Sequence, residues 1–228
     1  MAGVAALRAG AGKLQIATAP ETTTAIGCAV PEALVVPFDD AEQLAQRAHA
    51  IVFGPGMDGD PQCAQLLTRL AAVASVPMVL DAAALHVLGS AGVTIARTSV
   101  LTPHAGEMAD LLACDRAEVE NDPEGALAAC VQRHGATVVL KGERTYVAAP
   151  GSEIFCNKKG TIGLATSGSG DVLAGIIGGL LARGADPLQA ALWGVYVHAH
   201  AGERLVKRNG IGFLAREIAA EVPAILRG

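Results

Sequence analysis

One loop, ATSGSGDVLAG at residues 165–175, places an aspartate at the mouth of an apolar helix. Residues 166–170 are small, so a ligand can approach their backbone closely. Amides at a helix start carry partial positive charge and favour phosphate. Asp171 would repel that phosphate unless it has another task, such as taking a proton from a hydroxyl that attacks a phosphoryl group. The alternative is that Asp171 only caps the helix.

Four more loops follow apolar runs and carry polar or glycine residues. They are FGPGMDGD from Phe53, LDAAAL from Leu80, LTPHAGE from Leu101 and LKGERT from Leu140. The carboxyl ends of parallel strands meet at one edge of a sheet, where ligands bind. Together with the Gly-Ser-Gly-Asp loop, they predict one crevice bordered by five loops.

Each of these loops also has an ordinary structural explanation. Gly54-Pro55-Gly56 can be a simple turn, and Asp81 can cap the following helix. His104 can be a satisfied loop histidine, and Glu107 can be a first-turn carboxylate favoured by the helix dipole. Lys141 can be a solvated strand end. Taken singly, none of these residues identifies a reaction.

The elements that must position these loops are short apolar runs that alternate with helical stretches. The runs predict strands at 13–18, 33–37, 50–54, 77–81 and 137–142, and the stretches between them predict helices at 41–48, 61–73, 106–113 and 124–134. Strands that are apolar throughout are typical of a parallel sheet covered on both faces.

The last third of the chain has a different pattern. Residues 144–157 predict a hairpin with its turn near Pro150-Gly151. Three helices follow: one from Asp171 to Gly184, one with Asp186 as N-cap and Pro187 at its first position, and one over 213–226. The predicted fold is a single doubly wound α/β domain over residues 1–228, with a mostly parallel sheet and helices on both faces.

Composition narrows the possible partners. The net charge is −5 and no run of Lys or Arg occurs, which weighs against nucleic acid or an anionic membrane as a partner. The apolar run 172–182 is too short to span a bilayer, and the N-terminus lacks a signal-peptide pattern. Five scattered cysteines without a CxxC pair argue against disulfides and zinc, and indicate reduced thiols in the cytoplasm.

The loops together resemble the ribokinase-like superfamily. The blocks LTPHAGEMADLL, VVLKGERT, GLATSGSGDVLAGIIGGLLARG and ALWGVYVHAHAGE resemble the ADP- or ATP-dependent NAD(P)H-hydrate dehydratases nearly residue for residue. The resemblance covers almost the whole chain. Sugar and vitamin kinases of the superfamily share only the Gly-x-Gly-Asp element, so the LTPH block favours the dehydratase branch.

The resemblance implies roles for individual residues. It makes Asp171 the base and a substrate contact, and it adds His104, Gly54 and Gly56 as substrate contacts. It also implies a set of nucleotide-binding residues, namely Lys141, Gly142, Glu143, Arg144, Thr145, Gly168, Ser169 and Gly170. The amides of residues 168–171 would form the anion hole for the phosphate.

The implied reaction is dehydration of the S-epimer of hydrated NADH or NADPH (NADHX, NADPHX). ADP or ATP would phosphorylate the ring hydroxyl, and phosphate would then leave, with Mg²⁺ screening the transferring group. The resemblance also implies a homotetramer and functional pairing with an NAD(P)H-hydrate epimerase. Two other functions remain open: a sugar or vitamin kinase, and a nucleotide-binding homologue with little turnover.

The chain departs from the family pattern in three places. Ala83 stands where the family usually has a second aspartate, and Ala105 replaces a proline. The start of the chain, MAGVAALRAGAGKLQIAT, matches only the end of the family's first helix and the next strand. The expectation is therefore an N-terminally shortened form that lacks the first strand, with unpaired backbone on the neighbouring strands.

Overall fold

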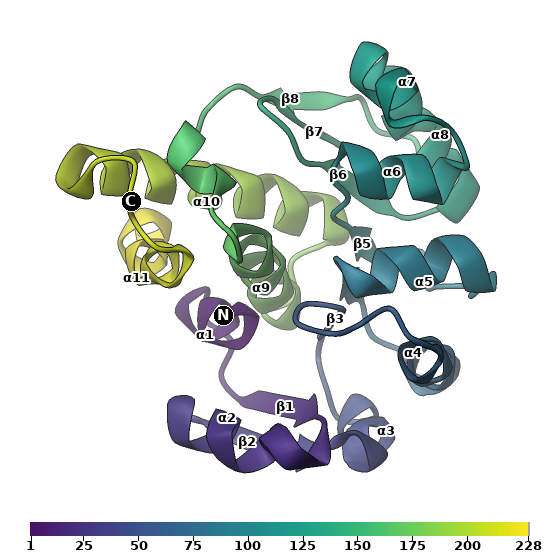
Figure 1. Ribbon diagram of the computed structural model, residues 1–228, viewed down its shortest axis with the longest axis vertical. Coiled ribbons are helices and arrows are strands. Elements are labelled where there is room, and N and C mark those ends of the chain that lie inside the picture. Colours follow the sequence, from purple (N-terminus) through teal and green to yellow (C-terminus); the bar gives the residue numbers. More distant parts are fainter. Residues whose placement is uncertain (228) are drawn as a thin grey trace.

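The centre of the fold is a six-stranded sheet with the order β3-β4-β5-β6-β7-β8, seen in a computed structural model that describes residues 1–227 (Figure 1). The first four strands are parallel, and β7 and β8 continue the sheet antiparallel. The strands are β3 (Ile51–Phe53), β4 (Met78–Leu80), β5 (Val100–Leu101), β6 (Thr137–Leu140), β7 (Thr145–Ala148) and β8 (Phe155–Asn157). The predicted mostly parallel sheet and the C-terminal hairpin are both confirmed.

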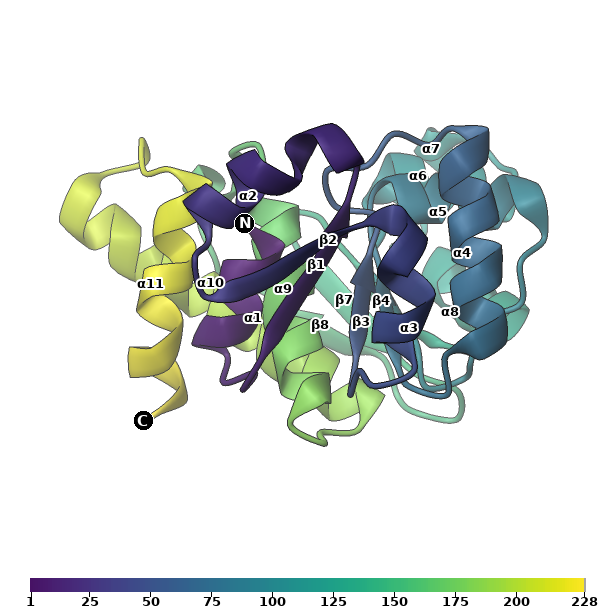
Figure 2. The ribbon, with the colours of Figure 1, turned by 90° about the horizontal axis from the view of Figure 1, so that it is seen from below.

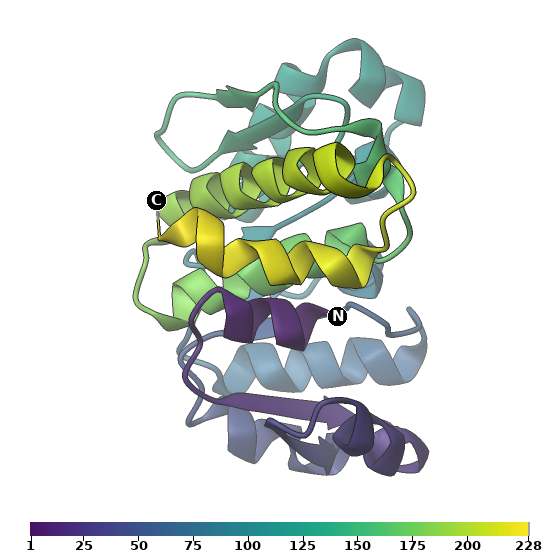
Figure 3. The same ribbon diagram turned by 90° about the vertical axis from the view of Figure 1, so that its left-hand side faces the viewer.

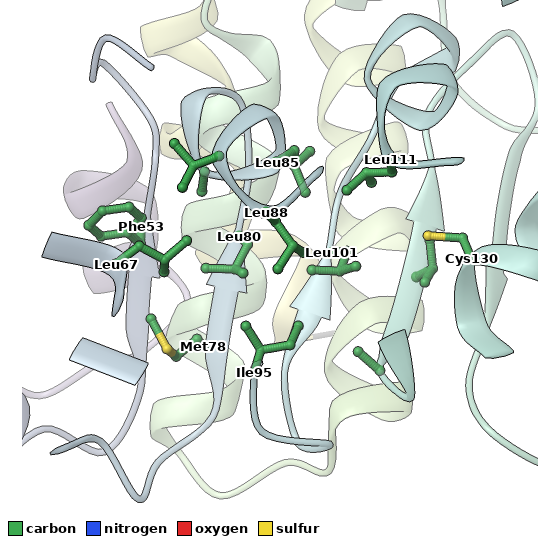
Figure 4. Packing of buried hydrophobic residues seen from close by; sticks show 14 of the residues in the cluster. Phe53, Leu67, Met78, Leu80, Leu85, Leu88, Ile95, Leu101, Leu111 and Cys130 are labelled. Carbon is green, nitrogen blue, oxygen red and sulfur yellow. The ribbon is translucent and has the colours of Figure 1, made fainter. Parts of the chain in front are cut away.

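Both faces of this sheet are apolar, as the uninterrupted strand patterns predict. Alternate strand residues point to opposite faces. Phe53, Met78, Leu80 and Leu101 belong to one buried cluster, which Figure 4 shows from close by. Their chain neighbours on the strands, such as Val79, join a second cluster on the other face. The helices are thus divided into two layers.

The first layer covers the face of Leu80 and Leu101 and contains α3 (Ala41–Ala45), α4 (Pro61–Val73), α5 (Ala83–Ala91), α6 (Ala105–Leu112), α7 (Arg116–Asn121) and α8 (Pro123–His134). The second covers the opposite face and contains α1 (Ala2–Arg8), α9 (Ser169–Ala182), α10 (Pro187–Asn209) and α11 (Ala215–Leu226). Figure 3 shows α1, α10 and α11 of this second layer. None of the described helices combines the length and apolar character that crossing a bilayer requires.

Two strands near the N-terminus form a separate sheet. β1 (Leu14–Thr18) pairs in parallel with β2 (Ala33–Pro37), and α2 (Thr23–Ala29) connects them. Figure 2 shows this pair as its own unit beside β3. Within residues 1–227 no strand joins β1 to β3, so β1-β2 and β3 to β8 form two separate sheets. The predicted domain, 1–228, extends one residue beyond the described range and stays a prediction.

The predicted helix bounds hold best where capping residues mark them. α4 has the predicted bounds, and α10 begins at Pro187 with Asp186 as its N-cap, whose Oδ1 accepts from the Gln189 N–H at 3.1 Å. The prediction for α9 is wrong by two residues at each end, because Gly168 is the N-cap and Arg183 the C-cap. The short helices α2, α5 and α7 were not predicted, whereas α1 agrees with the helix end expected at the start of the chain.

An exposed aromatic pair lies on α10. Trp193 is 53% exposed, and its ring meets that of Tyr196 edge to face, with 5.5 Å between centroids. The Tyr196 ring in turn lies 4.0 Å from that of His200. Trp193 is the only tryptophan of the chain. Because about half of it is exposed, its side chain contributes to the surface rather than to either buried cluster.

Candidate active site

The backbone hydrogen bonds between neighbouring parallel strands continue past the ends of the strands and so connect the loops that follow them. The Asp81 N–H donates to Phe53 O at 3.2 Å, and the Thr102 N–H donates to Leu80 O at 3.1 Å. The Lys141 N–H donates to Pro103 O at 2.7 Å. The loops after β3, β4, β5 and β6 therefore meet at one edge of the sheet, as predicted.

A buried ion pair lies at the centre of this edge. Asp81 is 2% exposed, and its Oδ1 accepts from Lys141 Nζ at 2.7 Å and from Thr102 Oγ1 at 2.8 Å. Lys141 Nζ also lies 3.6 Å from Glu107 Oε2. The interpretation of Asp81 as a helix cap is wrong, since Ala82 is the N-cap of α5 and the Asp81 carboxylate bonds Lys141 and Thr102 instead. Lys141 is not a solvated strand end either, because its side chain is 20% exposed and faces two carboxylates.

His104 and Glu107 form a capping box at the start of α6. The Glu107 N–H donates to His104 Nδ1 at 3.1 Å, and the His104 N–H donates to Glu107 Oε2 at 2.7 Å. Both ordinary explanations are therefore correct: His104 is a satisfied loop histidine and Glu107 a first-turn carboxylate. The His104 side chain is nevertheless 59% exposed and directed toward open space, so it remains available to a ligand.

Asp171 is the third residue of α9, not its N-cap. Gly168 caps the helix with φ +84°, a conformation that favours glycine. Burial raises the pKa of Asp171, and the negative charge of Asp81 raises it further, while the Met1 amino group and Lys141 act in the opposite direction. A carboxylate with a raised pKa is a stronger base when it is ionised.

An open groove of about 710 Å³ lies beside this network. Its walls include Met57, Gly59, Ala83, His86, His104 and Arg116. His104, at the start of α6, and Ala83, at the start of α5, both line the groove. The position at which the dehydratase resemblance leads us to expect a second aspartate is therefore on the groove wall. The groove and the Lys141 network share His104 and Glu107 at their border.

A family model described as NAD(P)H-hydrate dehydratase matches residues 1–224. The chain belongs to the NAD(P)H-hydrate dehydratase family. The ADP-dependent (S)-NAD(P)H-hydrate dehydratase of Xanthomonas campestris is 46% identical over 239 residues, which cover 99% of this chain and 82% of that protein.

Solved structures agree with the family assignment. The ADP/ATP-dependent NAD(P)H-hydrate dehydratase of Bacillus subtilis, co-crystallised with ATP and Mg²⁺ and soaked with CoA, has a TM-score of 0.87 and 30% identity, covering 99% of this chain and 84% of that one. A ribokinase-like superfamily protein of Enterococcus faecalis has a TM-score of 0.90 and 27% identity, covering 99% and 80%. The predicted ribokinase-like fold is confirmed.

The residues that the dehydratase resemblance assigns to the nucleotide do not all meet in this structure. Lys141 and Gly170 are neighbours, because a Cβ placed on Gly170 would lie 3.4 Å from Lys141 Nζ. Gly142, Glu143 and Arg144 form an exposed bend that leads to Thr145 at the start of β7. They lie at the same edge, with their side chains in solvent.

The predicted anion hole lies at the start of α9. Of the amides at residues 168–171, that of Ser169 donates to Thr166 O at 3.2 Å. Gly170 and Asp171 occupy the second and third positions of α9, where backbone N–H groups have no acceptor within the helix. The Asp171 amide also hydrogen-bonds its own carboxylate, so the Gly170 amide is the better placed of the two to meet an anion.

Among the predicted substrate contacts, the two glycines differ. Gly54 is buried with φ +111°, and a Cβ at this residue would overlap the carbonyl oxygen of Asp81. Gly56 is exposed with φ +71°, and a Cβ there would meet nothing within 4 Å. The structure thus gives Gly54 a packing role, and only Gly56 is open to a ligand.

His198 is a site residue that the sequence reasoning missed. It extends from α10 to α9, where its Nε2 lies 3.0 Å from Ser169 Oγ and 3.1 Å from Ser169 O. Burial lowers the pKa of His198 to about 4, so the ring is neutral at pH 7. Nothing in the spacing of the sequence indicates this contact, because 29 residues separate the partners.

Metal ligands are sparse at this edge. Within residues 1–227 no group of three or more His, Cys, Asp or Glu side chains is placed to hold a metal ion. The crevice carboxylates of Asp81 and Glu107 already face the Lys141 ammonium. A divalent ion would therefore have to draw its ligands mainly from a bound nucleotide, whose phosphate oxygens suit Mg²⁺.

Proposed function

We propose that this chain dehydrates the S-epimer of hydrated NADH and NADPH with ADP or ATP as co-substrate, as a lyase of metabolite repair. The observation that carries the proposal is the position of Asp171 in the first turn of α9, next to Gly170 and the Lys141 ammonium. Membership of the dehydratase family and the 46% identity with the Xanthomonas enzyme support this substrate class.

The residues suit a two-stage reaction. Asp171 takes the proton of the ring hydroxyl, and that oxygen attacks the terminal phosphorus of the nucleotide, whose bond to the bridging oxygen breaks. Phosphate then leaves with the electron pair of its bond to the ring carbon. Loss of a proton from the adjacent carbon restores the double bond of dihydronicotinamide. ATP yields ADP and phosphate, and ADP yields AMP and phosphate.

The chain supplies binding and charge for these steps. The backbone amides at the start of α9, with Gly170 beside the Lys141 ammonium, would hold the transferring phosphoryl group. His104, at the border of the open groove, would contact the hydrated nicotinamide ring. Mg²⁺, held by the nucleotide phosphates, would neutralise part of their charge.

The assay follows the return of dihydronicotinamide absorbance when the purified chain is mixed with hydrated NADH and a nucleotide. We expect absorbance to return with ADP or ATP and not without nucleotide. Comparing the rates with ADP and ATP, and with hydrated NADH and hydrated NADPH, gives the preferred nucleotide and the preferred substrate. A chain that consumes ATP only with a sugar or vitamin alcohol would instead be a kinase. A chain that binds nucleotide without turnover would be a catalytically weak homologue.

Assembly and setting are further parts of the proposal. We propose a homotetramer on the family resemblance, to be tested by light scattering of the purified chain. Relatives named bifunctional NAD(P)H-hydrate repair enzymes are longer, and the chain spans 46% and 44% of two of them. This supports functional pairing with an epimerase that supplies the S-form. Five free cysteines and a substrate made from the NAD(P)H pool support a cytoplasmic location.

A further inference from the structure

Asp81 combines features that a merely structural residue does not need. It is a carboxylate at the end of a central strand, almost fully buried, and its partners Lys141 and Thr102 lie on two other loops. A buried charge is costly unless it is paired and hydrogen-bonded. Both partners bind the same oxygen, Oδ1, which leaves Oδ2 without a hydrogen bond among the described residues.

The unbonded oxygen is turned toward α9. A Cβ placed on Gly170 would lie 3.7 Å from Asp81 Oδ2 and 3.4 Å from Lys141 Nζ. The ion pair therefore lies directly against the backbone of the residue that precedes Asp171. Because the Lys141 side chain is flexible, a fixed carboxylate is needed to hold its ammonium at this spot.

The backbone around Asp81 is unusually constrained. Ala82 has φ +50° and ψ −120°, which a residue with a Cβ adopts only under strain. The Asp81 carbonyl oxygen packs against Gly54 so closely that only glycine fits there. Strain of this kind persists only where the surrounding structure enforces it, and strained residues cluster at active sites and ligand-binding segments. The backbone beside Asp81 is thus held in place, and the bonds from Thr102 and Lys141 orient its carboxylate.

We propose that Asp81 is a positioning residue of the dehydration reaction, which holds the Lys141 ammonium against the first turn of α9. This inference rests on the proposed function. Asp81 acts through two neighbours: it fixes the Lys141 ammonium, which binds the phosphoryl group during its transfer, and its negative charge lies near Asp171.

The charges around Asp171 give this proposal a distinctive readout. Asp81 faces it from the loop after β4, Lys141 from the loop after β6, and the Met1 amino group from α1. After burial, the charge of Asp81 is the main cause that raises the pKa of Asp171. Activity that needs ionised Asp171 is present above this pKa and is lost as the pH falls through it. Removal of the Asp81 charge lowers the pKa, so the loss moves to lower pH.

The test uses two variants that separate charge from geometry. Asp81→Asn keeps the shape and can still accept from Thr102 but lacks the charge. We expect its acidic limb of kcat/KM to move to lower pH and its KM for ADP to rise about tenfold, the loss typical of one hydrogen bond to a charged group. Asp81→Glu keeps the charge and displaces it, so we expect a raised KM for ADP with the acidic limb near that of the wild type.

Thr102→Val is the matched control, because it removes the other bond to Oδ1 and leaves both charges in place. Its acidic limb should not move. The proposal would be overturned if Asp81→Asn kept both the acidic limb and the KM for ADP of the wild type. If Asp81→Asn does not fold, a wild-type KM for ADP in Asp81→Glu would overturn it instead. Calorimetry with ADP gives a readout without turnover. A wild-type chain that binds ADP but leaves hydrated NADH unchanged would refute the proposed function, while weaker ADP binding by Asp81→Asn would still support the role of Asp81.

Discussion

The two glycine-rich loops at the sheet edge look alike in sequence and differ in what surrounds them. In Gly54-Pro55-Gly56, the space beside the first glycine is taken by the chain itself, because the Asp81 carbonyl oxygen lies where a Cβ of residue 54 would be. In Gly168-Ser169-Gly170, the last glycine faces the charged ends of Lys141 and Asp81 at ordinary contact distance.

The difference separates two reasons for a glycine in an active site. Gly54 permits the close approach of two backbone segments, so it serves the fold that carries Asp81. Gly170 leaves the helix start uncovered beside a cation, where we propose that it serves a ligand. A pattern of glycines cannot distinguish these reasons, whereas the atoms that surround each glycine can.

The largest expected effect comes from the residue that follows the second loop. Asp171→Asn keeps the shape of the side chain but cannot act as a base, so we expect kcat to fall about 10²–10⁴-fold. The affinity for ADP, measured by calorimetry, should change little. A near wild-type rate would mean that Asp171 only stabilises the first turn of α9.

Gly54→Ala tests the packing reason. Its Cβ would overlap backbone, and its φ of +111° is unfavourable for alanine. We expect a loss of about 3 kcal/mol or more in unfolding free energy, measured by denaturant titration. Gly56→Ala is the control, since its surroundings are open and only its positive φ costs energy, roughly 1 kcal/mol. Equal losses in the two variants would remove the contrast between them.

Gly170→Ala tests the ligand reason. The position is helical and its new Cβ makes only ordinary contacts, so the melting temperature should hold or rise. The methyl group would stand where a phosphate approaches Lys141, and we expect the KM for nucleotide to rise about tenfold, equivalent to roughly 1.4 kcal/mol. A fall in stability with an unchanged KM would place Gly170 in the same class as Gly54.

His104→Ala concerns the groove that borders the first loop. The variant loses one member of the capping box, which costs about 1 kcal/mol of stability. We expect the KM for hydrated NADH to rise more than the KM for ADP, because the ring is exposed toward the groove. Steady-state kinetics with each substrate varied in turn measures both constants, and equal increases would leave His104 with its capping role alone.

Much of the fold followed from local sequence patterns. The apolar strands predicted a sheet buried on both faces, and Asp186-Pro187 marked the start of α10, because period and capping are properties of neighbouring residues. β5 has only two residues, too few for a pattern, and α5 begins after strained Ala82 with no side-chain cap. These elements depend on tertiary contacts, so local patterns could not indicate them.

The same limit applies to the candidate site. The sequence identified Asp171, His104 and Lys141 through motifs, and the structure brings their loops to one edge. The partnership of Lys141 with Asp81 crosses 60 residues of sequence, and nothing about an Asp after an apolar strand predicts it. Two ordinary explanations, for Asp81 and for Asp171 as caps, were wrong because Ala82 and Gly168 are the N-caps of α5 and α9.

The exposed Trp193 on α10 makes the chain its own optical probe of assembly. As the only tryptophan, it dominates the intrinsic fluorescence, and about half of its surface is exposed to water when the chain is alone. Burial of α10 against another subunit would shift the emission to shorter wavelength, so dilution of the sample would report dissociation directly, with no label attached.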